Sequence, residues 1–433
     1  MKKSLIALAA LAATSAFAQS SVTLYGRAEA SVDLGYRATT NINSSGSTSL
    51  NGAVVPNSAF STNAGSSVSK PGFRVQDGNN QGLGSSRFGF RGTEDLGGGL
   101  KANFVMEAGV NLDDGSSGNG GGQFFSRSAW VGLSGGFGEV RLGRFVQGSF
   151  GVHANGLALG AASGLYETGA TIAQAGVRTS NGIQYRSPDF GGISGTISLT
   201  APETNASSST VVSPTQTTTV NGGGKTGVDL SLAYANGPIY LGVGYNKQDS
   251  STTTNNGLVG PLSVITNASG PRTDYTLSAS YNFGVAQPFF NYTNRKDRAS
   301  SSTITGGVVT SIGGTTLAGT GINTNGRQYA LGVKVPLGAA TLVTSFGMHK
   351  TTGSANTLGN AQNVAVEREV RAFQIGGLYP LSKRTTLMAN YGINNLKDRT
   401  VTRQLIGIGF GTNGTTTTEI KQRGLNVGVQ HLF

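Results

Sequence analysis

Cysteine is absent from the 433 residues of this chain, and tryptophan occurs only once. Charged residues make up 12% of the sequence and hydrophobic residues 37%, whereas glycine occupies 68 positions. Without cysteine no disulfide can close the fold, although small secreted domains commonly rely on disulfides. So little hydrophobic material would also make a poor core for a soluble domain of this length. The composition therefore excludes a disulfide scaffold and argues against an ordinary soluble globular domain.

Long hydrophobic runs are also missing, apart from one at the N-terminus. A basic start, Met1–Lys3, precedes an apolar run over Leu5–Ala13 and the small-residue end Ala16–Ala18. This order is typical of a secretory signal peptide, and we expect residues 1–18 to be removed before Gln19. The alternative, a membrane-spanning helix, would need about 20 apolar residues. The chain is therefore expected to be exported.

Acidic residues are the scarcer charge. Removing Lys2 and Lys3 with the signal peptide lowers the net charge from +12 to +10. Nucleic acid is the usual partner of a basic chain, but an exported protein does not meet it, and the arginines lie singly rather than in runs. An anionic lipid surface or an anionic solute is the better partner for this charge.

Helical periodicity is nearly absent, and apolar residues recur instead at every second position in stretches of roughly ten residues. In the first stretch, Val22, Leu24, Gly26, Ala28, Ala30 and Val32 alternate with Thr23, Tyr25, Arg27, Glu29, Ser31 and Asp33. Successive side chains of a strand point to opposite faces, so one face suits lipid and the other water. This pattern predicts transmembrane strands.

Sixteen such stretches can be marked along the chain, which is an even number. An antiparallel barrel with an even number of strands closes on itself and leaves no unpaired strand edge in the lipid. The sequence therefore predicts an all-β, transmembrane antiparallel β-barrel. The expected strands start near Val22, Ser86, Leu100, Ser126, Glu139, Asn181, Gly192, Thr226, Pro238, Thr273, Pro288, Arg327, Ala339, Glu369, Arg384 and Lys421.

The connections between these strands alternate in length. Short turns such as Gly135–Gly138, Asn236–Gly237 and Pro380–Lys383 are expected on the periplasmic side. Long connections rich in Ser, Thr, Asn and Gly are expected as outer loops at the opposite end, at residues 39–82, 202–225, 250–271, 299–325 and 396–419. Their composition alone would also fit a disordered linker or an adhesin stalk. We prefer loops because strands bracket each of them.

The chain ends on Phe433, preceded at two-residue steps by Leu425, Val427, Val429 and His431. We interpret this aromatic end as an outer-membrane assembly signal, which implies the barrel-assembly machinery as a partner. The alternative is an ordinary final strand with a chance terminal aromatic residue.

Five segments together resemble the general porins of Gram-negative bacteria, most closely the betaproteobacterial anion-preferring branch with the neisserial and Burkholderia-type porins. The second of them is the most specific, and the resemblance runs from the signal peptide to the final Phe. The segments are Val22–Arg27, Ser86–Gly97, Ala129–Leu133, Glu139–Arg144 and Gln184–Pro188.

The resemblance implies a homotrimer of sixteen-stranded barrels in the outer membrane, each an open diffusion pore for small anionic or neutral solutes. It also implies that residues 19–433 form one barrel domain whose third outer loop, residues 145–180, folds inward and narrows the lumen. No cofactor or metal is expected.

In the family a ladder of basic residues on the barrel wall faces an acidic side on the inward loop. By motif, Arg27, Arg87, Arg144 and Arg186 match the basic positions, and Glu107 matches the acidic wall position. Alternation places all of these on the watery face except Arg144. Because Arg144 shares the parity of the apolar Val140 and Leu142, reaching the lumen requires a break such as a bulge at Gly143.

The inward loop is poor in acidic residues. Between Phe145 and Ser180, Glu167 is the only carboxylate and lies in the same loop as Arg178. An arginine ladder with so little counter-charge should concentrate anions. The sequence therefore predicts an anion-preferring pore with Glu107 and Glu167 as its acidic side.

Three other function classes compete with this interpretation. An outer-membrane enzyme would need a catalytic set, but the chain has only His153, His349 and His431, without an evident Ser, Asp or metal spacing. An adhesin would confine its strands to one end of the chain. A sugar-specific channel would line its lumen with aromatic residues, for which Tyr25 and Tyr240 are the inward candidates.

Overall fold

The computed structural model describes residues 21–50, 53–56, 63–68, 72–77, 85–118, 123–159, 177–201, 207–213, 216–222, 226–249, 252–258, 264–268, 271–297, 302–305, 316–319, 323–358, 362–406 and 410–433. The expected signal peptide, residues 1–18, lies outside these ranges.

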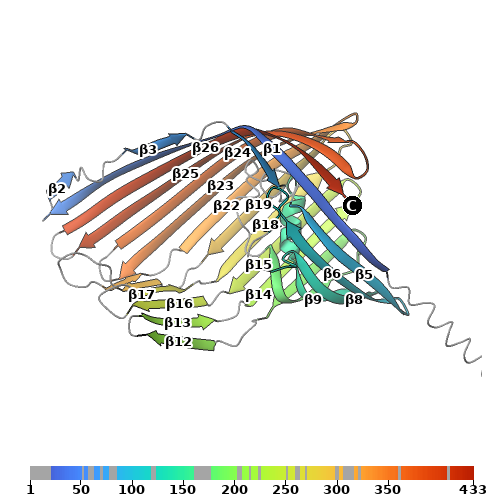
Figure 1. Cartoon of the computed structure of the whole chain (residues 1–433), viewed down its shortest axis with the longest axis horizontal. Coiled ribbons are helices and arrows are strands. Elements are labelled where there is room, and N and C mark those ends of the chain that lie inside the picture. Colours follow the sequence, from blue (N-terminus) through green and yellow to red (C-terminus); the bar gives the residue numbers. More distant parts are fainter. Residues whose placement is uncertain are drawn as a thin grey trace, which may run out of the picture.

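Within the described ranges, sixteen strands form one closed antiparallel ring, which confirms the predicted barrel. Each strand pairs with the next, and the last pairs back with the first, from Arg27 opposite Leu432 to Leu50 opposite Phe410. The C-terminus accordingly lies close to β1 in Figure 1. The ring consists of β1 (Ser21–Leu50), β5 (Arg87–Gly97), β6 (Leu100–Val110), β8 (Ser128–Gly135), β9 (Gly138–Val146), β10 (Arg178–Arg186), β11 (Ile193–Thr200), β14 (Thr226–Asn236), β15 (Ile239–Asp249), β18 (Arg272–Tyr281), β19 (Gln287–Asp297), β22 (Asn323–Leu337), β23 (Ala340–Leu358), β24 (Gln362–Pro380), β25 (Thr385–Ile406) and β26 (Phe410–Leu432).

Shorter strands extend the ring where long loops were expected. β4 pairs with β1 beyond β5, and β12, β13, β16 and β17 form a stack beside the barrel in Figure 1. The long connections therefore contain much more paired strand than the sequence predicted. These strands are β2 (Ala53–Pro56), β3 (Asn63–Val68), β4 (Gly72–Asp77), β7 (Ser117–Gly118), β12 (Ser207–Ser213), β13 (Gln216–Gly222), β16 (Thr252–Leu258), β17 (Val264–Ala268), β20 (Ser302–Thr305) and β21 (Thr316–Gly319).

Burial in this barrel is the reverse of burial in a soluble protein. On β1, Val22 and Leu24 are 65% and 57% exposed, whereas Glu29 and Asp33 are 0% and 1% exposed. The same contrast recurs around the ring, with apolar side chains outside and polar ones inside. An outward apolar band with a polar interior is what lipid requires of a spanning barrel.

The two ends of the barrel differ. At one end, which we call the turn end, β5 and β6, β8 and β9, and β22 and β23 are joined by tight connections. The opposite end, which we call the loop end, carries the long connections. From the loop end of β9 the chain enters α3 (Gly148–Asn155), which packs on the inner side of β11, β14, β15, β18 and β19. Among the described residues no helix is long and apolar enough to cross a membrane.

Candidate functional site

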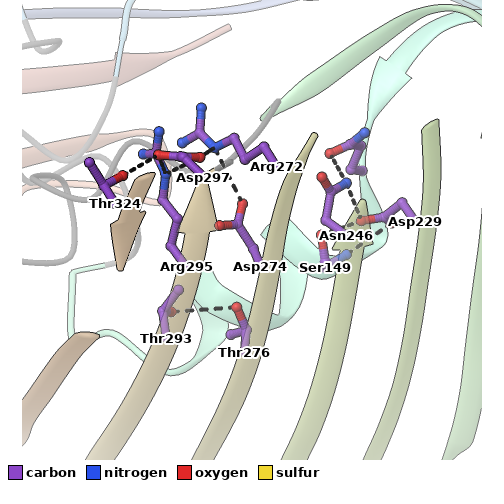
Figure 2. A network of polar contacts seen from close by, with 11 residues as sticks. Ser149, Asp229, Asn246, Arg272, Asp274, Thr276, Thr293, Arg295, Asp297 and Thr324 are labelled. Carbon is purple, nitrogen blue, oxygen red and sulfur yellow. Dashed lines mark hydrogen bonds and ion pairs between the residues drawn. The ribbon is translucent and has the colours of Figure 1, made fainter. Parts of the chain in front are cut away.

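The helix α3 is held to the barrel wall by buried polar contacts. Asp229, on β14, accepts a 3.2 Å hydrogen bond from the backbone N–H of Ser149 and another from its hydroxyl. Asn246, on β15, donates to both Asp229 and the side chain of Gln147, at 3.1 and 2.7 Å. Figure 2 shows Asp229 and Asn246 side by side next to Ser149. These contacts fix the start of α3 against one wall of the lumen.

The end of α3 is fixed in the same way. His153 is 1% exposed, and its Nδ1 lies 3.2 Å from the hydroxyl of Thr293 on β19. Asn291 donates to the carbonyl oxygen of His153 at 3.3 Å. His153 therefore helps to hold the helix against the barrel wall. Within the described residues no group of three His, Cys, Asp or Glu side chains is arranged to hold a metal ion.

Farther towards the loop end, the same wall carries charges of both signs that pair with one another (Figure 2). Arg295 Nε lies 2.9 Å from Asp297, and Arg272 Nε lies 3.3 Å from Asp297 and 3.9 Å from Asp274. Thr324 donates a further hydrogen bond to Asp297 at 3.1 Å. Two arginines thus face two aspartates, so this part of the lumen has no net charge.

The wall formed by β1, β5 and β6 has a different charge balance. Arg27 and Arg87 are directly opposite each other in the β1–β5 pair. Glu107, on β6, lies 3.8 Å from Arg87 Nε and 2.6 Å from Arg127 Nε, and it accepts a 3.0 Å hydrogen bond from the Tyr25 hydroxyl. The Glu107 carboxylate is therefore shared by the guanidinium groups of Arg87 and Arg127, and Arg27 lies beside them.

Arg178, at the start of β10, completes what we call the arginine cluster: Arg27, Arg87, Arg127 and Arg178. Its charge is close enough to interact with Arg127, Arg87 and Glu107. The Nε atoms of Arg27 and Arg178 are buried and find no hydrogen-bond partner among the described residues. Arg127 lies just before β8, and its burial, followed by the charge of Arg87, lowers the pKa of its guanidinium. With Glu107 and the nearby Glu29, the four arginines leave a net charge of +2.

Arg144 lies at an irregularity in the β9–β10 pair. Gly143 has φ 129°, and the register shifts on β10 between Thr179 and Gly182. The guanidinium of Arg144 donates to the carbonyl oxygen of Ser126 at 2.7 Å and to the hydroxyl of Ser180 at 2.6 Å. A break at Gly143 was predicted from the parity of Arg144, but the extra residue lies on the neighbouring strand β10, while the β8–β9 register continues unbroken through Gly143 and Arg144. Arg144 lies within electrostatic reach of Arg178.

Arg186 lies away from the arginine cluster. It is at the turn end of β10, opposite Glu139, and its guanidinium lies 3.9 Å from that carboxylate. Arg178 is at the other end of the same strand, about 26 Å away at ~3.3 Å per residue. Arg141 pairs with Glu139 at 2.6 Å and stacks on Trp130, 4.1 Å from the ring centre. Arg141, Glu139 and Trp130 help to line a separate cavity of about 270 Å³.

The predicted site residues are thus divided. Arg27, Arg87 and Glu107 lie together with Arg144 nearby, Arg186 lies near the turn end, and Glu167 is outside the described residues. The sequence interpretation missed Arg127 and counted Arg178 only as a loop charge. Arg127 has the parity of the outward Val131 and Leu133, but alternation does not apply to it because β8 begins at Ser128.

The predicted assembly signal, Phe433, lies where the ring closes. Its backbone N–H donates to Gly26 O at 3.1 Å, and its own carbonyl oxygen accepts from Gly26 N at 2.9 Å. The last residue of the chain therefore pairs with the first strand.

Comparisons with known proteins agree with this architecture. The profile of a family described as Gram-negative porin matches residues 4–399. The outer membrane porin protein 32 of Delftia acidovorans is 30% identical over 443 aligned positions, which cover 100% of both chains. An outer membrane porin protein of Bordetella pertussis is 29% identical, again over 100% of both chains. A solved structure titled "Anion-selective porin from Comamonas acidovorans" is 24% identical, with a TM-score of 0.54 over 96% of this chain and 100% of that one.

Proposed function

Since this chain belongs to the Gram-negative porin family, we propose that its pore prefers small anions and that the arginine cluster provides this preference. The protein is a channel of the outer membrane that passes small hydrophilic solutes.

The observation that carries the proposal is an imbalance of charge across the lumen. The arginine cluster has a net charge of +2, whereas the ion pairs of the opposite wall cancel. The Asp229 carboxylate on that wall is 1% exposed and is bonded to the start of α3. Between Gln147 and Leu159, the described part of the inward loop has no Asp or Glu. A narrow, water-filled region lined by charge of one sign raises the local concentration of counter-ions. An anion passing α3 would therefore meet fixed positive charge on one side and no fixed negative charge on the helix.

Arg186 supports the same anion preference at a different height in the pore, near the turn end. With Arg141 and Arg91 it places positive charge near the turn end, partly offset by Glu139. We propose that these arginines extend the basic path towards the periplasmic mouth, and that Glu167 contributes the acidic charge of the inward loop.

Two parts of the proposal concern partners. We propose that the barrel assembles as a homotrimer and that the barrel-assembly machinery recognises Phe433. We also propose that the protein has no enzymatic activity, because His153 is committed to structural contacts. Cross-linking in native membranes tests the trimer, since a monomer-only pattern would contradict it.

The selectivity is tested by measuring the zero-current potential across a planar bilayer with a salt gradient. Arg27→Gln together with Arg178→Gln removes two cluster charges without breaking an ion pair found among the described residues. We expect the potential to move towards cations, most strongly at low salt, because the Debye length falls from about 10 Å at ~0.1 M to about 3 Å at ~1 M.

The matched control is Arg327→Gln together with Arg423→Gln, which removes two exposed charges from the outer face of the barrel. This variant should keep the wild-type potential. If the cluster variant and the control behave alike, the net positive charge does not act at the cluster.

A further inference from the structure

The lumen wall near the turn end is hollowed beside Trp130. Five neighbouring strands, β1, β5, β6, β8 and β9, surround this cavity of about 270 Å³, which we call the arginine–tryptophan pocket. Their inward residues lie directly opposite one another in two rows that cross the wall. The row nearer the loop end is Thr23, Arg91, Val105, Trp130 and Gly143, and the row nearer the mouth is Ser21, Thr93, Asn103, Gly132 and Arg141.

A glycine in the second row lets the two rows interact. A Cβ atom on Gly132 would lie 2.4 Å from the carbonyl oxygen of Val140 and 3.3 Å from Cγ of Arg141. No side chain fits at this position, because a carbon atom cannot approach a backbone oxygen so closely. The side chain of Arg141 lies beside Gly132 instead, and its guanidinium reaches over the ring of Trp130 in the first row.

Both arginines of the pocket lie over aromatic rings. Arg141 lies 4.1 Å from the centre of the Trp130 ring, and Arg91 lies 5.2 Å from the centre of the Tyr25 ring. Such stacking uses the face of the planar guanidinium and leaves the N–H groups in its plane available to an anion. Arg141 already pairs with Glu139. Arg91 is exposed and forms no ion pair with any residue that the structure describes, so it is the cation available to a solute.

The floor of the pocket between the two arginines is apolar. Val105 and Trp130 are directly opposite each other, and both are half-buried, so part of each side chain remains accessible from the lumen. The polar groups around this floor are mostly neutral, and the Thr93 hydroxyl donates to the Asn103 side chain at 3.0 Å. Among the described lining residues, Glu139 is the only carboxylate and faces two arginines.

We propose that the arginine–tryptophan pocket binds a small aromatic carboxylate on its way through the pore. The guanidinium fork of Arg91 binds the carboxylate group, a pairing that is strong because both partners are charged. The aromatic ring of the solute lies on Val105 and Trp130, where ring pairs gain stability beyond the area that they bury. An apolar surface with a few polar groups that fix orientation is the usual form of a small-molecule site.

Other solutes use only part of this pocket. An inorganic anion pairs with Arg91 but leaves the apolar floor uncovered. A sugar stacks on Trp130 but has no charge for Arg91. An aromatic carboxylate uses the cation and the floor together, so the pocket favours it over both.

The position of the pocket fits a solute that has passed the arginine cluster. Arg91 follows Arg87 on β5 at a distance of about 13 Å, at ~3.3 Å per residue. Tyr25 connects the two levels, because its ring lies under Arg91 and its hydroxyl donates to Glu107. The proposal therefore rests on the proposed function, since the cluster must first admit anions to this part of the lumen.

The test uses the purified protein in neutral detergent at constant ionic strength. Trp130 is the only tryptophan of the chain, so its fluorescence reports occupation of the pocket without a label. Benzoate, cyclohexanecarboxylate, acetate, glucose and inorganic phosphate are titrated, and calorimetry gives a second measure of affinity. We expect benzoate to bind about 5-fold more tightly than cyclohexanecarboxylate because of ring stacking. The other three solutes should bind more weakly than both.

Charge and stacking are separated by variants. Arg91→Gln should weaken benzoate binding about 10-fold, because a charge-assisted contact is lost. The matched control, Arg384→Gln, removes an exposed charge from the same end of the barrel and should keep the wild-type affinity. Trp130→Leu should abolish the preference for benzoate over cyclohexanecarboxylate in calorimetry. Trp130→Phe keeps a ring and should retain that preference, which distinguishes lost stacking from disturbed folding.

Three results would overturn the proposal. Equal affinity for benzoate and acetate would indicate a site that recognises charge alone. Glucose binding as tight as benzoate binding would indicate a sugar site. Equal affinities of the Arg91→Gln and Arg384→Gln variants for benzoate would show that Arg91 does not bind the carboxylate.

The pocket and the proposed selectivity can fail separately. An anion-preferring zero-current potential in a chloride gradient, together with no binding of benzoate to the wild type, would overturn the pocket alone. A cation-preferring pore that still binds benzoate with the expected order of affinities would contradict the proposed function and support the pocket.

Discussion

The carboxylate of Asp229 on β14 caps α3 at Ser149, accepting hydrogen bonds from both its backbone N–H and its hydroxyl. The N-cap residue of the helix, Gln147, makes no capping bond of its own. The first N–H groups of a helix need acceptors, and a negative charge at this end also interacts favourably with the helix dipole. The barrel wall therefore supplies the cap that the sequence of the helix lacks.

Replacing Asp229 by Ala should loosen α3 from the wall. The change leaves Ser149 and Asn246 without their shared acceptor, at a cost of ~1–3 kcal/mol for each unsatisfied buried group. We expect single-channel records with larger conductance fluctuations and closure at lower voltage. Asp229→Asn, which keeps an acceptor oxygen, should be closer to the wild type. Identical noise in all three proteins would show that Asp229 does not hold the helix.

Arg178 and Arg186 should differ in their effect on selectivity, although both are on β10. Arg178→Gln removes charge from the arginine cluster, whereas Arg186→Gln removes charge from the turn end, where Glu139 and Arg141 remain. We expect the zero-current potential to shift more for Arg178→Gln. Equal shifts would mean that the arginine cluster does not influence the selectivity of the pore more strongly than the charges at the turn end.

Glu107→Gln should increase anion preference and decrease stability together. The substitution raises the net charge of the cluster by one unit, and it weakens the contact to Arg127, whose side chain is 8% exposed. We expect a loss of about 1–3 kcal/mol in the free energy of unfolding, measured by urea titration of the folded barrel in detergent. A more cation-selective pore would contradict the assignment of Glu107 to the lumen wall.

Deleting Phe433 should reduce assembly in the outer membrane without affecting export. The deletion removes the two backbone hydrogen bonds to Gly26 together with the aromatic end that we interpret as an assembly signal. Surface labelling and periplasmic fractionation would measure the outcome. Replacing Phe433 by Tyr, which keeps the backbone and an aromatic ring, is the control, and normal surface levels of the deleted chain would refute the prediction.

Alternation alone predicted most of the barrel, because lipid outside and water inside impose a period of two on every spanning strand. Glu29 on the inner face and Leu24 on the outer face follow from that rule. The rule fails where lipid no longer contacts the strand. β26 begins at Phe410 rather than near Lys421, and β24 at Gln362 rather than near Glu369, because hairpin pairing continues beyond the part of the strand that contacts lipid. On β26 this extension is rich in Thr.

The candidate site was less predictable, because alternation gives the face of a residue but not its height in the barrel. Alternation assigns Arg27, Arg87 and Arg186 to the same watery face, yet Arg186 lies near the turn end, away from the other two. Bulges also change the face itself. The extra residue beside Gly35 places Arg37 outside, and only the register with Arg423 reveals it.

The closure of β26 on β1 has a consequence for how the protein forms. Asn426 donates to Ser31 at 2.9 Å across 395 positions of sequence, so the seam joins the first strand made to the last. Contacts between such distant residues form slowly, and the edge of β1 that pairs with β26 has no partner until the last strand is in place. A chain shortened by premature termination would keep two open edges that lipid cannot satisfy. Completion of the ring is therefore an inherent check that the polypeptide is full length.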